Sequence, residues 1–182
     1  MPAIEKFTYE DYAALPATGK RYQLVEGELL VSPSPNVRHQ IVMMRIAMAL
    51  YSHVEAKQAG LLLAGPVDAI LSDEDVYVPD IAFVSKARKK IIAPEGFRGP
   101  PDLCVEILSP SNRRLDVKTK RANYAKFGVP ELWIVDPDED NIRLFRLQEN
   151  PASPQRIFEE GDTLKTTLLP GFELKLGPVF ER

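Results

Sequence analysis

Two carboxylates and a lysine occupy positions of this chain where apolar side chains are expected. Asp80 lies within the apolar run 76–84, and Glu106 lies within the apolar run 102–109. Lys120 interrupts the apolar face of a predicted helix. A buried, unpaired charge costs several kcal/mol of desolvation, so such groups pair with a cation or become neutral. Two carboxylates and a lysine together predict a metal site.

The residue types of this trio suit hydrolysis of a phosphodiester. Mg²⁺ or Mn²⁺ takes hard oxygen ligands and keeps positions open for water and a phosphate. Asp80 and Glu106 supply carboxylates, and the backbone carbonyl of Ile107 is the expected third oxygen. A lysine beside such a site can orient or deprotonate the attacking water and neutralise charge on the phosphoryl group. Lys120 is the candidate for that role.

Three elements must position these groups. The runs 76–84 and 103–108 are typical of buried strands. A helix is predicted from about Asn112 to Phe127, and its spacing places Lys120 on the same face as Tyr124. Asp116, one turn earlier, lies beside Lys120 and is either a support for the ammonium group or its structural ion pair.

The remaining segments complete a mixed fold. Residues 22–31 predict a hairpin around Glu26-Gly27. A long helix is expected over 36–59, between an Asn36 N-cap and Gly60, with Ile41, Met44, Met48 and Tyr51 on its apolar stripe. The runs 61–64, 67–71 and 76–84 resemble a meander. Strand 103–108, helix 112–127 and strand 132–135 predict a crossover with a parallel strand pair.

Later segments, at 141–148, 156–158 and 172–176, are typical of antiparallel edge strands. The fold class is therefore α/β or α+β: a mixed β-sheet core flanked by helices, with extra antiparallel strands at the C-terminal end. One domain is expected over 1–182, because 182 residues suffice to bury a substantial core. Its core spans about 22–137, and the C-terminal strands lie within 138–182.

Composition places the chain among ordinary globular proteins, with 45% hydrophobic and 27% charged residues. Cys104 is the single cysteine and is interpreted as a small core residue. No signal-peptide pattern or 20-residue apolar stretch is found, so no membrane association is expected and the cytoplasm is the predicted location.

Charge is unevenly distributed, although the net charge is only −3. Residues 86–126 contain eleven Lys and Arg against four acids, and this segment includes Glu106 and Lys120. A phosphate ligand would suit such a segment, whereas solvated loops and helix faces are the alternative interpretation. The candidate nucleic-acid-binding residues are Arg88, Lys89, Lys90, Arg113 and Arg114.

The motifs resemble the Uma-two family of restriction-endonuclease-like proteins, within the Pro-Asp…(Asp/Glu)-x-Lys nuclease superfamily. The matching segments are 22–29, Ser32-Pro33 with His39, Pro79-Asp80-Ile81, 106–111, Asp116 with Lys120 and Tyr124, and 128–137. The resemblance implies a core of helix, three-stranded meander, helix and strand, and a nuclease that acts on DNA.

Two positions depart from the family pattern. The superfamily lysine stands two residues after the second acid, where this chain has Leu108. The resemblance implies that the lysine has moved to the next helix, at Lys120, which the helix-face argument reaches independently. Glu26 stands where the family usually has aspartate.

Each candidate also has a structural interpretation. Asp80 would then cap a turn, and Lys120 would form a structural bridge with Asp116 or Glu106. His39 is a candidate for supporting the site or contacting substrate, and the alternative is a helix-capping or packing role. Glu26 is likewise a candidate for supporting the site or contacting substrate, and a structural role is the alternative. Tyr124 is a secondary candidate, although its regular apolar position favours a core role.

The resulting hypothesis is a Mg²⁺-dependent endonuclease in which Asp80 and Glu106 bind the metal and Lys120 assists the water. The main alternative is a non-catalytic module that binds nucleic acid or protein and retains the fold. Hydrolysis of a small nucleotide or another phosphoester is a further alternative. A homodimer is expected, because cutting a duplex requires access to two strands.

Overall fold

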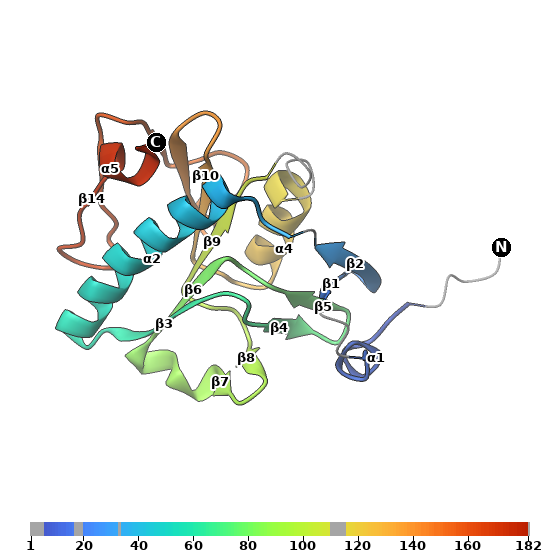
Figure 1. Cartoon of the computed structure of the whole chain (residues 1–182). Helices are drawn as coiled ribbons and strands as arrows, with labels where there is room; N and C mark the ends of the chain where they lie inside the picture. The colour runs from blue at the N-terminus through green and yellow to red at the C-terminus, as the bar shows by residue number, and fades with distance from the viewer. Residues whose placement is uncertain (1–5, 17–19, 33, 110–115, 182) are drawn as a thin grey trace.

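A mixed six-stranded sheet forms the centre of the molecule (Figure 1). The computed structural model describes residues 6–16, 20–32, 34–109 and 116–181. The strand order is β12-β11-β10-β9-β6-β3. These strands are β3 (Gly60–Ala64), β6 (Ile81–Ser85), β9 (Leu103–Ile107), β10 (Glu131–Asp136), β11 (Asn141–Arg146) and β12 (Arg156–Phe158). The sequence-based expectation of a mixed sheet with added C-terminal strands is confirmed.

The register of the central strands brings the two carboxylates together. β6 pairs antiparallel with β9, and Ile81 lies opposite Val105. Continuing that register by one residue places Asp80 beside Glu106, and directly opposed residues share a face of the sheet. β9 pairs parallel with β10, so the predicted crossover through the helix between them is confirmed.

Helices cover both faces of this sheet. α2 (Val37–Lys57) packs on one face, where a core cluster includes Val105 and Ile107. α4 (Arg121–Lys126) packs on the other face, where a second cluster includes Cys104 and Tyr124. Because successive strand residues point to opposite faces, Glu106 lies on the α4 side with Cys104. Cys104 is a buried core residue, as predicted.

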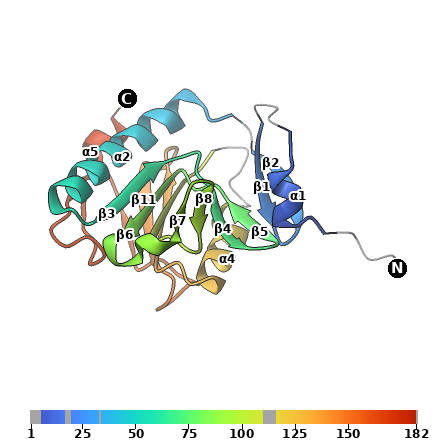
Figure 2. The same ribbon diagram turned by 90° about the horizontal axis from the view of Figure 1, so that it is seen from below.

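A second sheet extends the molecule on the side of the N-terminal elements (Figure 2). Its strand order is β2-β1-β5-β4-β8-β7, and the short helix α1 (Tyr9–Ala13) lies beside it. Its strands are β1 (Arg21–Val25), β2 (Glu28–Ser32), β4 (Ala69–Ser72), β5 (Asp75–Tyr77), β7 (Ile92–Ala93) and β8 (Gly96–Arg98). Between β6 and β7, the chain forms the short helix η1 (Lys86–Ile91).

The predicted hairpin at Glu26-Gly27 is confirmed, with Val25 opposite Glu28. Both turn residues have positive φ, 53° at Glu26 and 83° at Gly27, as a two-residue type I′ turn requires. Glutamate is an unusual residue in this conformation. Its backbone N–H donates to Asp75 Oδ1 at 3.0 Å, and this contact helps to hold the turn.

The expected meander of 61–64, 67–71 and 76–84 is not what forms. β3 pairs with β6 in the central sheet, whereas β4 pairs with β5 in the second sheet. The run 76–84 is therefore divided between two sheets at Pro79. Proline has no backbone N–H to donate to a ladder, which explains the break immediately before Asp80.

The predicted apolar stripe of α2 is its exposed face. Met44, Met48 and Tyr51 are 53% to 62% exposed, whereas Val42, Ile46, Leu50 and Val54 form the buried face. Both sets have helical spacing, so periodicity alone could not decide between them. Asn36 is the N-cap, as predicted, and its side chain accepts the N–H of His39. Gln58 in the left-handed conformation, rather than Gly60, ends the helix.

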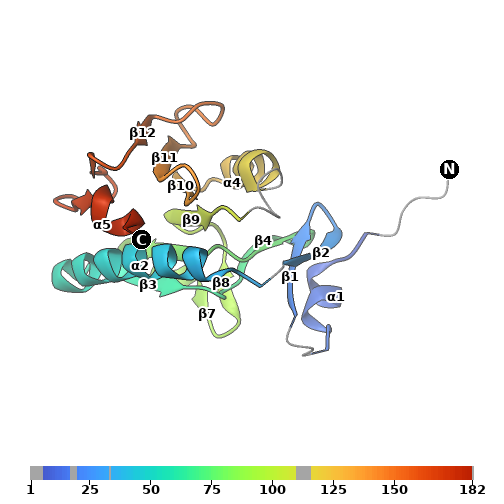
Figure 3. The same cartoon turned by 45° about the horizontal axis from the view of Figure 1, so that its top comes forward.

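The C-terminal segment packs against α2 (Figure 3). It contains β13 (Thr163–Leu164), β14 (Leu174–Lys175) and α5 (Leu176–Phe180). Arg38 donates to the carbonyl of Phe180, and Arg45 donates to the carbonyl of Glu181, each at 2.6 Å. Within the described part of the chain, no helix is long and apolar enough to cross a bilayer.

Glu131, at the start of β10, gives the fold a testable pH dependence. It is buried and accepts hydrogen bonds from Trp133 Nε1 and Thr166 Oγ1, each at 2.7 Å. Burial raises its pKa above the ordinary 4.5. The folded state therefore binds more protons than the unfolded state above pH 4.5, so the free energy of unfolding should fall as pH rises through the folded pKa.

The Glu131→Gln variant should lack this component of the pH dependence, because an amide does not titrate. Denaturant unfolding of both proteins between pH 4.5 and 8 would measure the two slopes. Glu160→Gln, at an exposed acid, is the matched control and should behave as wild type. Identical slopes for wild type and Glu131→Gln would contradict the prediction.

Candidate active site

Glu106, Lys120 and Tyr124 form a buried cluster on the α4 side of the central sheet. Lys120 Nζ lies 2.7 Å from Glu106 Oε2, and both residues are only 3% exposed. The Tyr124 hydroxyl donates to Glu106 Oε1 at 2.6 Å. Burial, together with the charge of Glu106, raises the pKa of Tyr124 well above its ordinary value, so its hydroxyl stays protonated and remains a donor. The cluster fixes the Glu106 carboxylate through both of its oxygens.

The predicted helical face of Lys120 is confirmed, although the helix itself is not regular. Lys120 ends a π-helical turn, η2 (Asp116–Lys120), which leads directly into α4. π-helical turns inside helices occur frequently at functional sites. The side chain of Asp116 and the residues 112–115 lie outside the described parts of the chain.

Asp80 lies immediately before β6, the strand that pairs with β9, and two groups contact its carboxylate. Its Oδ2 accepts the backbone N–H of Ile107 at 2.8 Å and lies 3.3 Å from Nε2 of His39. His39 reaches it from the first turn of α2, where Asn36 caps the helix. The structure thus brings His39 to the carboxylate from the opposite face of the sheet.

Two oxygen-bearing groups of this site fit a hard divalent cation. The Asp80 side chain is 16% exposed, and among the described residues no hydrogen bond is found at its Oδ1. Each carboxylate oxygen has two lone pairs, so Glu106 can accept a further ligand while it keeps Lys120 and Tyr124. Within the described ranges, no group of three or more His, Cys, Asp and Glu is arranged around a metal position. Mg²⁺ would therefore need two carboxylates, a backbone carbonyl and waters, which is its common ligand set.

A polar chain that the sequence analysis missed supports α4. Asn123 Nδ2 donates to the Tyr77 hydroxyl at 2.7 Å, and that hydroxyl lies 3.4 Å from Asp75 Oδ1. Asp75 in turn accepts the N–H of Glu26. The sequence offered one signal for Asn123: it stands three residues after Lys120, and residues at that spacing are neighbours on a helix surface. Glu26 therefore connects to α4 through this chain, and it is an exposed turn residue itself.

The structure does not gather all the predicted cations at the site. Arg88, Lys89 and Lys90 lie on η1. This helix follows the C-terminal end of β6, whereas Asp80 precedes the N-terminal end of the same strand. Arg88 is bound to Asp102 Oδ1 at 3.0 Å, whereas Lys89 and Lys90 are exposed. Five strand residues separate η1 from Asp80 by roughly 17 Å. Arg113 and Arg114 lie outside the described residues.

Paired carboxylates at the ends of neighbouring strands, with a lysine on the following helix, define a protein of the restriction-endonuclease-like class. A crystal structure described as a putative nuclease belonging to DUF820, from Anabaena variabilis, has the same fold. It matches with a TM-score of 0.81 and 21% identity, over 96% of this chain and 97% of that chain. A comparison with curated protein sequences finds no match.

The family model Uma2, described as "Putative restriction endonuclease", matches residues 9–177. The chain belongs to the Uma2 family. This confirms the resemblance that the sequence motifs indicated, and it assigns the chain to a family of nucleases. The register of β6 and β9 places Asp80 and Glu106, the two acids that the sequence analysis singled out, beside each other.

Proposed function

We propose that this protein is a metal-dependent endonuclease that hydrolyses phosphodiester bonds in DNA. The observation that carries the proposal is the position of Asp80 beside Glu106, with Lys120 Nζ 2.7 Å from Glu106. Asp80, Glu106 and the carbonyl of Ile107 are the proposed ligands of Mg²⁺ or Mn²⁺. Family membership supports the nuclease class, whereas the metal and the DNA substrate rest on the chemistry of these residues.

The protein groups have distinct roles in this proposal. Bound Mg²⁺ would supply charge stabilisation on the phosphate and lower the pKa of a bound water. Lys120 donates from its ammonium group to the attacking water or to a phosphate oxygen, and so orients the water and offsets developing charge. Tyr124 holds Glu106 in place, and His39 holds Asp80.

Cleavage of plasmid DNA is the direct test. Purified protein would be incubated with supercoiled plasmid and with single-stranded DNA, in Mg²⁺, in Mn²⁺ and in EDTA. Metal-dependent nicking that EDTA abolishes would support the proposal. Turnover of small phosphodiesters without cutting of either polymer would indicate a phosphoesterase instead.

A specific observation favours one alternative, a non-catalytic module with the same fold. The Lys120–Glu106 pair is buried, and Nζ of Lys120 lies 2.7 Å from Oε2 of Glu106. Such a pair can be a purely structural network. Isothermal titration of Mn²⁺ separates the two functions, because only the enzyme requires a divalent ion bound by Asp80 and Glu106.

We also propose that the protein forms a homodimer through the exposed face of α2. Five apolar side chains on this face are 41% to 75% exposed: Val37, Ile41, Met44, Met48 and Tyr51. Their spacing of four, three, four and three residues is that of a helix–helix seam. A two-fold axis would place the same stripe of a second copy against it, which makes the surface self-complementary.

The flanking cations leave this stripe apolar. Arg38 and Arg45 both donate to C-terminal backbone carbonyls, so their guanidinium groups are held toward α5. Contiguous apolar surface of this kind is uncommon on monomers and marks interaction sites. A second copy is the proposed occupant because the proposed cutting of a duplex requires two sites.

The double substitution Met44→Glu/Met48→Glu should convert a dimer to a monomer. Light scattering after size-exclusion chromatography should give twice the 20.4 kDa chain mass for wild type and one chain mass for the variant. Ala56→Glu, at an exposed position of α2 outside the stripe, is the control. Wild type that is monomeric at tens of micromolar concentration would overturn this part of the proposal.

A further inference from the structure

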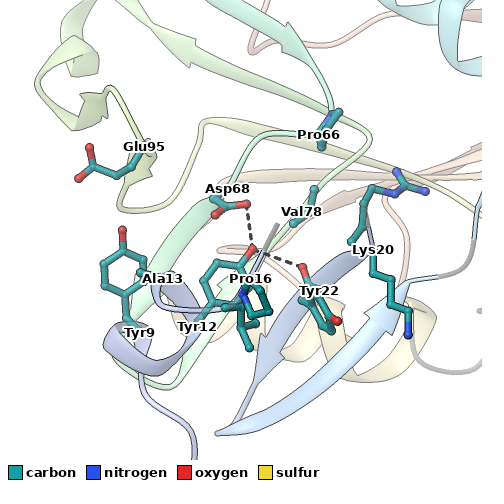
Figure 4. A pocket seen from close by; sticks show the side chains of 12 residues that line it. Tyr9, Tyr12, Ala13, Pro16, Lys20, Tyr22, Pro66, Asp68, Val78 and Glu95 are labelled. Atoms are coloured by element: carbon teal, nitrogen blue, oxygen red, sulfur yellow. Dashed lines mark hydrogen bonds between the residues drawn. The ribbon is translucent and has the colours of Figure 1, made fainter. Parts of the chain in front are cut away.

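A pocket of about 420 Å³ lies between α1 and the second sheet (Figure 4). That volume lies within the range of small-molecule sites. Three aromatic rings line it, together with two cations and two acids. These residues are Tyr9, Tyr12, Tyr22, Lys20, Arg21, Asp68 and Glu95. None of them belongs to the proposed catalytic cluster.

The chemical groups of the pocket are spread along its wall. Figure 4 shows Glu95 and Tyr9 on one side, Lys20 and Tyr22 on the other, and Asp68 with the Tyr12 ring between them. A nucleotide offers a partner for each kind of group, with hydrogen-bonding groups on the base edge, an aromatic plane and a phosphate. Stacking on aromatic side chains and contacts of cations with phosphate are the usual means of binding unpaired nucleotides.

Asp68 provides the acceptor for a base edge. Its Oδ1 accepts the Tyr12 hydroxyl at 3.1 Å, and the same hydroxyl lies 3.4 Å from the carbonyl of Tyr22. Within the described part of the chain, no other hydrogen bond of the Asp68 carboxyl group is found. Glu95 is less suited, because it forms an ion pair with Arg98. Asp68 thus has an oxygen left for an amino group of a ligand.

The wall of this pocket is continuous with the backbone around Asp80. Val78 lines the pocket and stands two residues before Asp80, a separation of at most about 7 Å. Pro66 also lines it, and the N–H of the preceding Gly65 donates to the carbonyl of Asp80 at 2.7 Å. A nucleotide close to the scissile phosphate is therefore within reach of the pocket.

We infer that this pocket binds an unpaired nucleotide of the substrate strand, with a preference for bases that carry an exocyclic amino group. These bases are adenine, cytosine and guanine, and thymine lacks such a group. The inference rests on the proposed nuclease function, because it takes the ligand to be part of the cleaved strand. It adds base preference, which the catalytic residues alone do not provide.

Binding in EDTA tests the pocket separately from cleavage. The full chain would be titrated into fluorescein-labelled hexamers of dC, dA and dT, and anisotropy would be measured. Wild type should bind dC and dA hexamers about tenfold more tightly than dT, as expected for a hydrogen bond to a charged group. Asp68→Asn should reduce that preference to about twofold or less, and Tyr9→Leu should weaken binding of all hexamers about tenfold.

Matched controls lie elsewhere on the surface. Asp138→Asn removes an exposed acid between β10 and β11, and Phe127→Leu removes a partly exposed ring from the C-terminal end of α4. Both should bind as wild type does. Circular dichroism would establish that the pocket variants are folded. If Asp68→Asn does not fold, Tyr9→Leu, which changes a partly exposed ring, provides the second variant.

The outcomes are distinguishable from those of the proposed function. Unchanged affinity and base preference in folded Asp68→Asn and Tyr9→Leu variants would overturn the pocket assignment, even if the plasmid is cut. Competition of dCMP, dAMP and dTMP against the labelled hexamers provides a further measurement. Mononucleotides that compete as well as hexamers at equal concentration would overturn the assignment to a strand. If the expected base preference were found without any metal-dependent cutting, the result would contradict the proposed nuclease function but support the assignment of the pocket.

Discussion

The Lys120→Ala variant is expected to lose DNA cleavage by about 10²–10⁴-fold, the range for removal of a positioned proton-transfer group. It is also expected to lose about 3–5 kcal/mol of unfolding free energy, because the buried Glu106 carboxylate would lose its cationic partner. Plasmid nicking in Mg²⁺ and denaturant unfolding would measure the two effects. Lys118→Ala, at an exposed position of the same helical segment, should alter neither.

A second variant separates catalysis from stability. Lys120→Met/Glu106→Gln replaces the buried pair with uncharged groups of similar size, a change that is often neutral for stability. The amide oxygen that this variant carries at position 106 can still accept the Tyr124 hydroxyl. Recovered stability with cleavage still lost would support the catalytic role of the pair. Cleavage at the wild-type rate in this double variant would show that Lys120 and Glu106 are a structural bridge.

The Asp80→Asn variant is expected to lose metal-dependent cleavage by about a thousandfold or more, because a bound metal supplies several kcal/mol of charge stabilisation. The amide oxygen of asparagine can still accept the Ile107 N–H, so the free energy of unfolding should change by less than about 1 kcal/mol. Electron paramagnetic resonance of free Mn²⁺ would measure binding, and plasmid nicking would measure activity.

The matched control for this variant is Asp73→Asn, which removes a negative charge from the exposed turn between β4 and β5. It should bind Mn²⁺ and cut DNA as wild type does. If Asp80→Asn retained both wild-type Mn²⁺ affinity and wild-type cleavage, Asp80 would not be a metal ligand. Its role would then be to cap the backbone at Ile107.

The proximity of Glu106 and Lys120, two of the proposed catalytic residues, followed from local features of the sequence. Glu106 within an apolar strand and Lys120 on an apolar helix face were recognisable because a buried charge requires a partner wherever it lies. The crossover that contains both was also recognisable, because a strand, a helix and a strand with short connections form a parallel pair. The 2.7 Å contact between these two residues agrees with that interpretation.

The contact between His39 and Asp80 could not be predicted from local features of the sequence. His39 begins α2 on one face of the central sheet, whereas Glu106 lies on the opposite face. Periodicity indicates that a helix has an apolar face but does not determine which surface covers it. For the same reason the exposed stripe of α2 was taken for its buried face.

The sequence by itself determined which residues are the candidates for chemistry, because a charged side chain within an apolar segment, as at Asp80, Glu106 and Lys120, is a local property. Tertiary structure alone decided which strands pair and which cations lie near the site. It divided 76–84 between two sheets and placed Arg88 to Lys90 at the far end of β6. It also formed the pocket around Asp68. Pairing between distant segments depends on the packing of the whole chain, which no local pattern encodes.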